Sequence, residues 1–347
     1  MKNPLMQELR RDGQGGLISL LVHVDDFLVS AAKGRKDLIQ GVFKQLQVKF
    51  DIHDIEEIGE GGRTSQFCGI EIQRNRVKGT LKISQSRFVK ELIDKFDKGG
   101  NIKVVPAKTG LVLLRTGGRP LSQEEIRRYR ELVGALLWLS TRTRAELSWI
   151  VGVLTRFYTA PTQDHMEAAI EVLRYLRGTV SLGIVYSSDA KDGLKGGCDA
   201  AYADDKESAR SRTGYGFMFC GGLISWNAKL QSFVATSTQH AEYGSASSAA
   251  RECVWLRMVT TELGWPTLGP TQMYSDSSSA LALMKHPIIS GKTKHINVAF
   301  HYVREQIENG SIKFSFIPTK RMLADLFTKA LPRDTFQAFR EQFGIKA

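Results

Sequence analysis

The acidic residue whose position most needs an explanation is Glu242. Apolar residues spaced three and four positions apart predict a helix over 239–263 with one buried face. This face carries Ala246, Ala249, Cys253, Leu256, Val259 and Leu263. One turn toward the N-terminus the same face reaches Glu242, where an apolar side chain would be expected. Taken alone, Glu242 is explained at least as well as an acid that the helix dipole favours in the first turn.

Three aspartates occupy comparable positions at the ends of predicted elements. Asp199 follows a glycine-rich strand that starts near Leu194, and Asp276 closes a strand that starts at residue 272. Asp325 lies among apolar residues at the start of the predicted last helix. Each aspartate, considered singly, is compatible with a turn former or a helix cap.

Taken together, the four carboxylates indicate a metal site. If the two strands are neighbours in one sheet, Asp199 and Asp276 converge at one end of it. Four carboxylates in one cleft repel and raise each other's pKa unless cations neutralise them. Oxygen ligands without Cys or His suit Mg²⁺, with Mn²⁺ as the other candidate. Two such ions about 3.5–4 Å apart would clamp the attacking and leaving oxygens of a phosphodiester, which is the chemistry of a two-metal nuclease.

A second pair of carboxylates, Asp25 and Asp26, stands between two apolar segments near the N-terminus. The segments 17–24 and 27–30 are rich in Leu, Val and Ile, which predicts the two strands of a tight hairpin. The paired carboxylates are then expected at the hairpin tip.

The elements of the first half are expected to be short strands followed by helices. Beyond the hairpin, helices are predicted over 36–50 and near 88–96, and strands over 67–73 and 80–84. The stretch 97–120 contains two Gly-Gly pairs and is predicted to be a linker. Helices follow over 122–140, 145–158 and 164–177, and Ser122 with Glu125 forms a capping-box signature. The arginines of these helices are suited to phosphate contacts, although a solvated helix face explains them equally well.

The second half has a different pattern of elements. Short strands are predicted over 194–203, 214–220, 223–228 and 231–236, before the long helix over 239–263. A strand over 272–275, helices over 278–285 and 293–308, a strand from residue 311 and a final helix complete the chain. In the strand from 311, Ile312, Phe314 and Phe316 alternate with polar residues. This order predicts the α/β class, with a mixed sheet flanked by helices.

Composition and charge limit the classes of protein that the chain can belong to. Its 347 residues, 42% of them apolar and 24% charged, predict a folded chain of two or three domains. No apolar run approaches the roughly 20 residues of a membrane span, and the N-terminus lacks a signal peptide. The four widely spaced cysteines are expected to be reduced thiols of an intracellular protein that is not secreted. A net charge of +12 favours a polyanionic partner such as nucleic acid, or describes a merely basic soluble protein.

The C-terminal half resembles the ribonuclease H domain of copia-type LTR retrotransposon Pol polyproteins. The resemblance is carried by Cys198-Asp-Ala-Ala-Tyr, Ser211-Arg-Thr-Gly-Tyr-Gly-Phe, Ile224-Ser-Trp, Thr236-Ser-Thr-Gln-His-Ala-Glu-Tyr, Tyr274-Ser-Asp-Ser, Thr293-Lys-His-Ile-Asn and Leu323-Ala-Asp-Leu-Phe-Thr-Lys. The four metal-binding acids of that family fall on Asp199, Glu242, Asp276 and Asp325. The resemblance therefore implies a ribonuclease H-like mixed five-stranded sheet flanked by helices, which cleaves the RNA strand of RNA–DNA hybrids with two Mg²⁺ ions.

The upstream half looks like the end of the same polyprotein's reverse transcriptase. The matching stretches are Leu21-Val-His-Val-Asp-Asp-Phe, Phe67-Cys-Gly-Ile-Glu-Ile, Ile83-Ser-Gln-Ser-Arg-Phe, Tyr129-Arg-Glu-Leu-Val-Gly and Arg174-Tyr-Leu-Arg-Gly-Thr. The resemblance implies an α+β remnant: a truncated reverse transcriptase palm over 1–105, a helical thumb and connection region over 106–188, and the ribonuclease H-like domain over 189–347.

Several positions depart from the family pattern. The family usually has Tyr where His23 stands, and it often has acids where Ala201 and His240 stand. The chain starts just before the palm hairpin, so Asp25 and Asp26 are expected to form an incomplete polymerase metal site. Reverse transcription by this chain alone is therefore not expected, unless the missing reverse transcriptase segment or other Pol products act as partners.

Two other functions are alternatives to a nuclease that cleaves RNA–DNA hybrids. One is a catalytically dead, nucleic-acid-binding remnant of a decayed retrotransposon, which the truncated palm favours. The other is a DDE-type integrase or transposase, but in such sites the glutamate comes last, whereas Glu242 comes second here. A retrotransposon protein is expected in cytoplasmic virus-like particles or in the nucleus.

Overall fold

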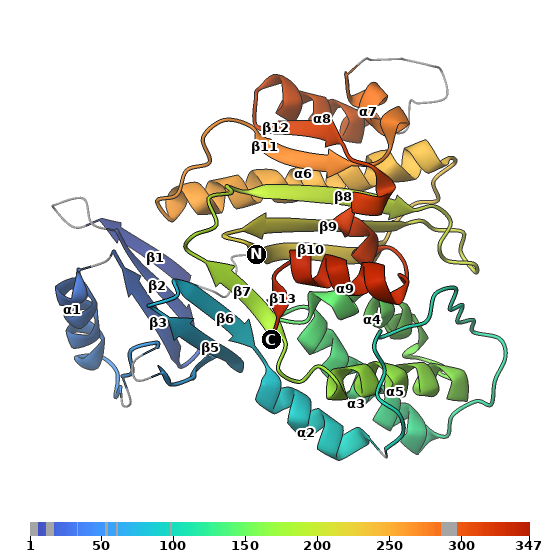
Figure 1. Cartoon of the computed structure of the whole chain (residues 1–347), viewed down its shortest axis with the longest axis horizontal. Helices are drawn as coiled ribbons and strands as arrows, with labels where there is room; N and C mark the ends of the chain where they lie inside the picture. The colour runs from blue at the N-terminus through green and yellow to red at the C-terminus, as the bar shows by residue number, and fades with distance from the viewer. Residues whose placement is uncertain are drawn as a thin grey trace.

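A computed structural model describes residues 6–11, 17–32, 34–52, 55–59, 62–97, 99–285 and 297–347. These residues form three sheets with helices packed around them (Figure 1). No helix within these ranges combines the length and the apolar character needed to cross a membrane.

The first sheet contains the predicted hairpin. Strands β1 (Met6–Arg11), β2 (Leu17–His23) and β3 (Asp26–Ala31) pair antiparallel in that order, and α1 (Lys36–Gln47) packs beside β3. The hairpin turn consists of Val24 and Asp25, and Val24 takes a positive φ of 54°. The paired carboxylates therefore lie at the tip as predicted. Strand β1 was not predicted, because its sequence is mostly polar and does not alternate.

The second sheet joins segments that are far apart in the sequence. Its antiparallel order is β13 (Ile345–Lys346), β7 (Gly183–Ser187), β6 (Thr80–Ser84), β5 (Ile70–Asn75) and β4 (Ser65–Phe67). The single strand predicted over 67–73 is wrong, because Cys68 and Gly69 both take positive φ and form a two-residue hairpin turn. Strands β7 and β13 were not predicted.

Helices fill the middle of the chain. The helices are α2 (Ser86–Phe96), α3 (Gln123–Ser140), α4 (Ser148–Leu154) and α5 (Gln163–Arg177), and short 3-10 turns flank α4. The capping box is confirmed, because Ser122 Oγ accepts the Glu125 N–H and the Glu125 carboxylate accepts the Ser122 N–H at 2.8 Å. The described residues of the predicted linker form no helix, and their only strand-like contact is an isolated bridge at Pro120.

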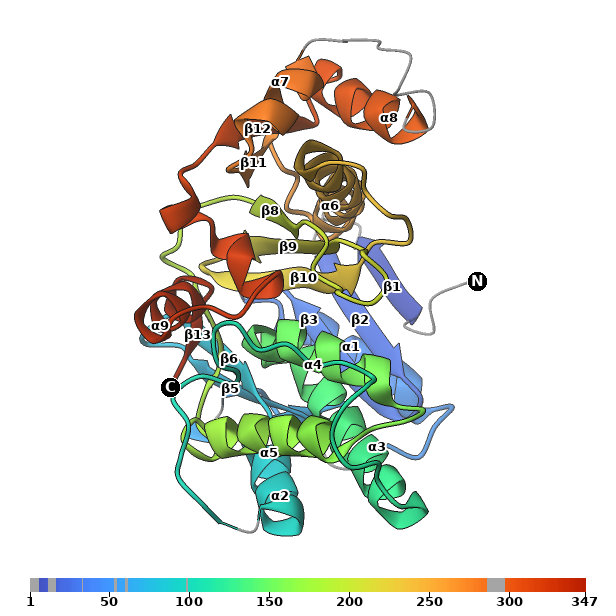
Figure 2. The same ribbon diagram turned by 90° about the vertical axis from the view of Figure 1, so that its right-hand side faces the viewer.

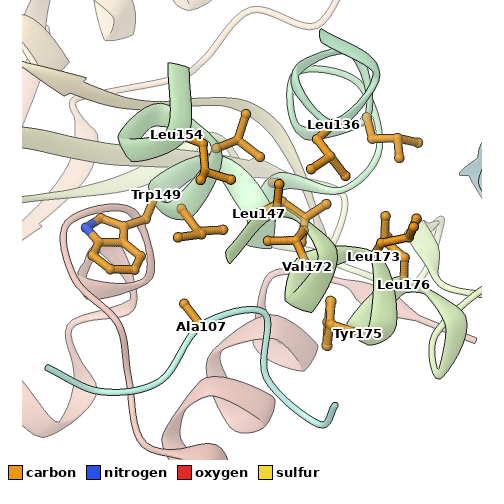
Figure 3. Packing of buried hydrophobic residues seen from close by; sticks show 14 of the residues in the cluster. Ala107, Leu136, Leu147, Trp149, Leu154, Val172, Leu173, Tyr175 and Leu176 are labelled. Atoms are coloured by element: carbon orange, nitrogen blue, oxygen red, sulfur yellow. The ribbon is translucent and has the colours of Figure 1, made fainter. Parts of the chain in front are cut away.

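These helices build a hydrophobic core that also includes the C-terminal residues. Leu136, Leu147, Leu154 and Val172 interdigitate between α3, α4 and α5 (Figure 3). The same cluster includes four residues from the end of the chain, Phe327, Phe336, Phe339 and Ile345. The helical region and the end of the chain thus share one core, and the domain boundaries at 105/106 and 188/189 remain predictions.

The third sheet is the mixed five-stranded sheet that was predicted. Its order is β10 (Gly222–Leu230), β9 (Arg212–Phe219), β8 (Lys195–Ala201), β11 (Thr271–Ser275) and β12 (Ile312–Phe316). Strand β9 is antiparallel to both of its neighbours, β10 and β8, while β8, β11 and β12 are parallel. The strand predicted over 231–236 is wrong. The Gln231 side-chain amide donates to the carbonyl of Ala241 at 2.8 Å, which directs this segment into the next helix.

Helices cover both faces of this sheet. Helix α6 (Thr238–Glu262) packs on β8 and β9, and α7 (Ser278–Lys285) and α8 (Asn297–Glu308) lie against it. Residues 293–296 of the predicted helix over 293–308 lie outside the described residues. On the opposite face lie the 3-10 helix η6 (Leu323–Phe327) and α9 (Arg333–Gln342) (Figure 2). Asp325 therefore belongs to η6 and not to the start of the last helix, because Pro332 separates the two elements.

Candidate metal centre

Three aspartates come together at one end of the mixed sheet. Asp199 lies in β8, Asp276 directly follows β11, and Asp325 lies in η6. One carboxylate oxygen from each lies within 4.8 Å of those of the other two. The register of the parallel strands explains the pairing, because Gly197 faces Tyr274 and the two aspartates each follow two residues later.

Glu242 faces this group from the first turns of α6. The first four residues of the predicted stripe, from Ala246 to Leu256, are buried, whereas Val259 and Leu263 are only partly buried. Glu242 itself is 7% exposed, and its Oε2 atom has no hydrogen-bond partner among the described residues. Burial, followed by the charges of the neighbouring aspartates, raises its pKa to about 9. The charges of the three aspartates thus act on Glu242, the fourth predicted acid, although its carboxylate is not one of the three that lie within 4.8 Å of one another.

Lys329 supplies a positive charge to the cluster. Its Nζ lies 2.8 Å from Asp325 Oδ1, one turn along the chain. Burial and the charge of Asp199 raise the pKa of Asp325 to about 7, and Lys329 opposes this rise. Burial alone would lower the pKa of Lys329, but the neighbouring aspartates outweigh it and raise the pKa. This residue was not predicted, although a lysine four positions after an acid is a recognisable pairing signal.

Two threonines hold the aspartates in place. The buried Thr328 hydroxyl donates to Asp199 Oδ2, and the Thr319 hydroxyl donates to Asp276 Oδ2 at 2.6 Å. Hydrogen bonds of this kind orient metal-ligating carboxylates. A Cβ atom on Gly214 would lie 2.5 Å from Thr328 Cγ2, so only glycine lets η6 approach β9 this closely. These contacts were not predicted, because nothing in the sequence shows which hydroxyls meet the acids.

The donor set fits a hard divalent cation. The clustered oxygens come only from carboxylates, and Mg²⁺ and Mn²⁺ prefer such ligands. Glu242 Oε2 is a buried acceptor that no donor of the described residues reaches, and a cation would satisfy it. Without a cation, the closely spaced carboxylates raise one another's pKa.

The other predicted acids, Asp25 and Asp26, lie in the first sheet. Asp26 Oδ2 accepts the backbone N–H of Cys68 at 2.9 Å. Within the described ranges, no third Asp, Glu, His or Cys joins them at metal-ligand spacing. Their role in a polymerase site stays a prediction.

Strand order and sequence similarity define the fold and the family of the chain. The strand order and directions define the part from β8 onward as a ribonuclease H-like domain. The Retrovirus-related Pol polyprotein from transposon TNT 1-94 of Nicotiana tabacum is 34% identical over 341 residues, which is 97% of this chain and 25% of that protein. The polyprotein from transposon RE1 of Arabidopsis thaliana is 31% identical over 334 residues, or 95% of this chain and 22% of that protein. The chain belongs to these retrovirus-related Pol polyproteins of copia-type transposons.

These matches cover nearly the whole chain but only a small part of each relative. The chain spans about a quarter of the length of the curated relatives it matches. No family model matches it. Among solved structures, LC11-RNase H1 from compost aligns over 39% of this chain and 92% of its own, with 16% identity and a TM-score of 0.30.

Proposed function

We propose that the ribonuclease H-like domain hydrolyses the RNA strand of RNA–DNA hybrids, with Mg²⁺ or Mn²⁺ held by Asp199, Glu242, Asp276 and Asp325. The observation that carries the proposal is the approach of three aspartate oxygens to within 4.8 Å, on β8, β11 and η6. Membership of the Pol polyprotein family supports a nucleic-acid substrate. The net charge of +12 suits a polyanionic partner.

The residues of the chain would prepare the site for this chemistry. Bound divalent cations would activate a water molecule and stabilise charge on the phosphodiester. Asp199 is central, because it is buried and oriented by Thr328. Lys329 is protonated and lies beside Asp325. Its positive charge reduces the electrostatic repulsion between the acids before substrate binds. Contact with the ribose 2′-hydroxyl would distinguish the RNA strand from the DNA strand.

The proposal is tested by cleavage of a labelled RNA–DNA hybrid with Mg²⁺ and with EDTA. We expect the RNA strand to be cut only with Mg²⁺, and Asp199→Asn to abolish cutting while circular dichroism shows a folded chain. Asp189→Asn, the same change at an exposed carboxylate outside the site, is the matched control and should cut normally. Cleavage by Asp199→Asn at the wild-type rate would refute the metal assignment.

A catalytically inactive, nucleic-acid-binding remnant is the second candidate. The ion pair between Lys329 and Asp325 favours it, because it partly neutralises the cluster without any cation. This candidate requires a folded chain that binds the hybrid but does not cut it at any Mg²⁺ or Mn²⁺ concentration.

We propose no DNA synthesis by this chain alone. Asp25 and Asp26 lack a third acid in the described residues, and two carboxylates do not complete a two-metal polymerase site. Primer extension on a templated duplex tests this, with and without the rest of a copia-type reverse transcriptase added in trans. Extension by the chain alone would contradict the proposal.

A further inference from the structure

A cavity of about 400 Å³ lies beside the aspartate cluster. Its walls come from the same segments that carry the acids. Gly197 precedes Asp199 by two residues on β8, and Tyr274 precedes Asp276 by two residues at the end of β11. Residues 321–324, which lead into Asp325, also line the cavity.

The sheet side of the cavity is lined by Gly196, Gly197 and Gly216, which carry no side chains. A Cβ atom on Gly214, which pairs with Asp199, would meet Thr328 at 2.5 Å. A Cβ atom on Gly197 would have no neighbour nearer than the Tyr274 carbonyl at 3.6 Å and Met322 Sδ at 3.8 Å. A side chain at Gly197 would therefore contact Tyr274 and Met322, and glycine leaves this part of the cavity unfilled.

The lining combines apolar surface with a cation at the rim. Phe316, at the end of β12, is 56% exposed, and Met322 adds a flexible sulfur-containing side chain. Arg321 is exposed, and its guanidinium makes no hydrogen bond or ion pair within the described part of the chain. The other basic residue of the lining, Lys195, is already paired with Asp192 at 2.5 Å. Arg321 is thus available to an anion.

We propose that this cavity binds an organic anion of nucleotide size, with its flat ring against Phe316 and Met322 and its phosphate at Arg321. The volume lies within the range of about 300–1,000 Å³ that is typical of small-molecule sites. Aromatic rings bind bases by stacking, and arginine binds phosphate through paired donors. The proposal does not depend on the nuclease function, because binding here requires neither a cation nor cleavage.

The test is isothermal titration of the full chain with adenosine 5′-monophosphate in EDTA, which prevents any cation from bridging the phosphate to the aspartates. We expect saturable binding at one site per chain. Arg321→Ala should weaken it at least fivefold, as should Phe316→Ala, which removes an exposed side chain without disturbing the core. The matched control is Lys320→Ala, which removes the neighbouring exposed cation outside the lining and should leave the affinity unchanged.

A filling variant and two smaller probes complete the design. Gly197→Val places a branched side chain against Tyr274 and Met322 in the lining and should abolish binding while circular dichroism stays unchanged. Adenosine and inorganic phosphate should each bind more weakly than the monophosphate that joins them. Three results would each overturn the proposal: no saturable binding by about 10 mM, equal weakening by Lys320→Ala, or adenosine binding as tightly as its monophosphate.

Discussion

Lys329 Nζ lies 2.8 Å from Asp325 Oδ1, so the acid cluster contains its own counter-charge. The aspartate side chain is 6% exposed and the lysine 44%, which means that the lysine approaches a buried carboxylate from the solvent side. Within the described part of the chain, Lys329 is the basic residue that forms an ion pair with these acids.

The first prediction is that Lys329→Ala destabilises the protein mainly when no metal is present. Loss of the cation leaves buried carboxylates uncompensated, and for a half-exposed lysine the expected cost is about 1–2 kcal/mol. Urea unfolding in EDTA and in Mg²⁺ measures the effect, and Mg²⁺ should remove most of it. An equal loss of stability in both conditions would show that the lysine acts only through packing.

The second prediction concerns the pH dependence of the metal-free protein. The pKa of Glu242 is raised to about 9 and that of Asp325 to about 7, from ordinary values of 4.5 and 3.8. Between the ordinary and raised values, the folded chain keeps protons that the unfolded chain has lost. These two groups therefore lower the free energy of unfolding as pH rises from about 4 to about 9.

Denaturant unfolding in EDTA across this pH range tests whether the free energy of unfolding falls as the pH rises. Glu242→Gln should flatten the upper part of the profile, because glutamine does not ionise. Mg²⁺ should also flatten it, since cations stabilise the ionised carboxylates. If Glu242→Gln keeps the wild-type slope, the glutamate does not ionise within the cluster as inferred.

The third prediction separates orientation from packing at Thr328. Its side chain is fully buried and its hydroxyl donates to Asp199. Thr328→Val keeps the shape but removes the donor, and Mg²⁺-dependent cleavage should fall at least about tenfold. Thr328→Ser keeps the donor and should retain most of the activity. Similar losses in both variants would instead point to the missing packing of the methyl group.

Sequence patterns located the acids better than they located the elements around them. Asp199 and Asp276 could be predicted to lie close together, because the carboxyl ends of neighbouring parallel strands lie at the same edge of a sheet. Glu242 was visible as a break in an apolar stripe of period 3.6. Asp325 was placed on the wrong element, because η6 is a short 3-10 helix without a periodic pattern of its own.

The elements that escaped prediction depend on distant partners. Strand β7 pairs with β6, about a hundred residues earlier, and β13 is only two residues long. Neither has a local turn partner that would mark it as a strand. The hydroxyls of Thr328 and Thr319 escaped for the same reason, since their hydrogen bonds reach 129 and 43 residues along the chain.

The fourth prediction is that the ribonuclease H-like domain depends on the helical region. Phe327, Phe336 and Phe339 are buried in the same core as the residues of α3, α4 and α5. Trp226 Nε1 also donates to the carbonyl of Ser140 at 2.8 Å. A fragment of residues 189–347 would expose these aromatic side chains, and each contributes about 1.5–3 kcal/mol when fully buried.

The fragment 189–347 should therefore unfold at a markedly lower temperature than a fragment of residues 86–347, which keeps the helices. It should also bind Mg²⁺ more weakly, because η6, which carries Asp325, packs directly against α4. Thermal unfolding followed by circular dichroism, with and without Mg²⁺, compares the two fragments. Equal melting temperatures and equal stabilisation by Mg²⁺ would mean that the domain is autonomous and that the shared core does not support the aspartate cluster.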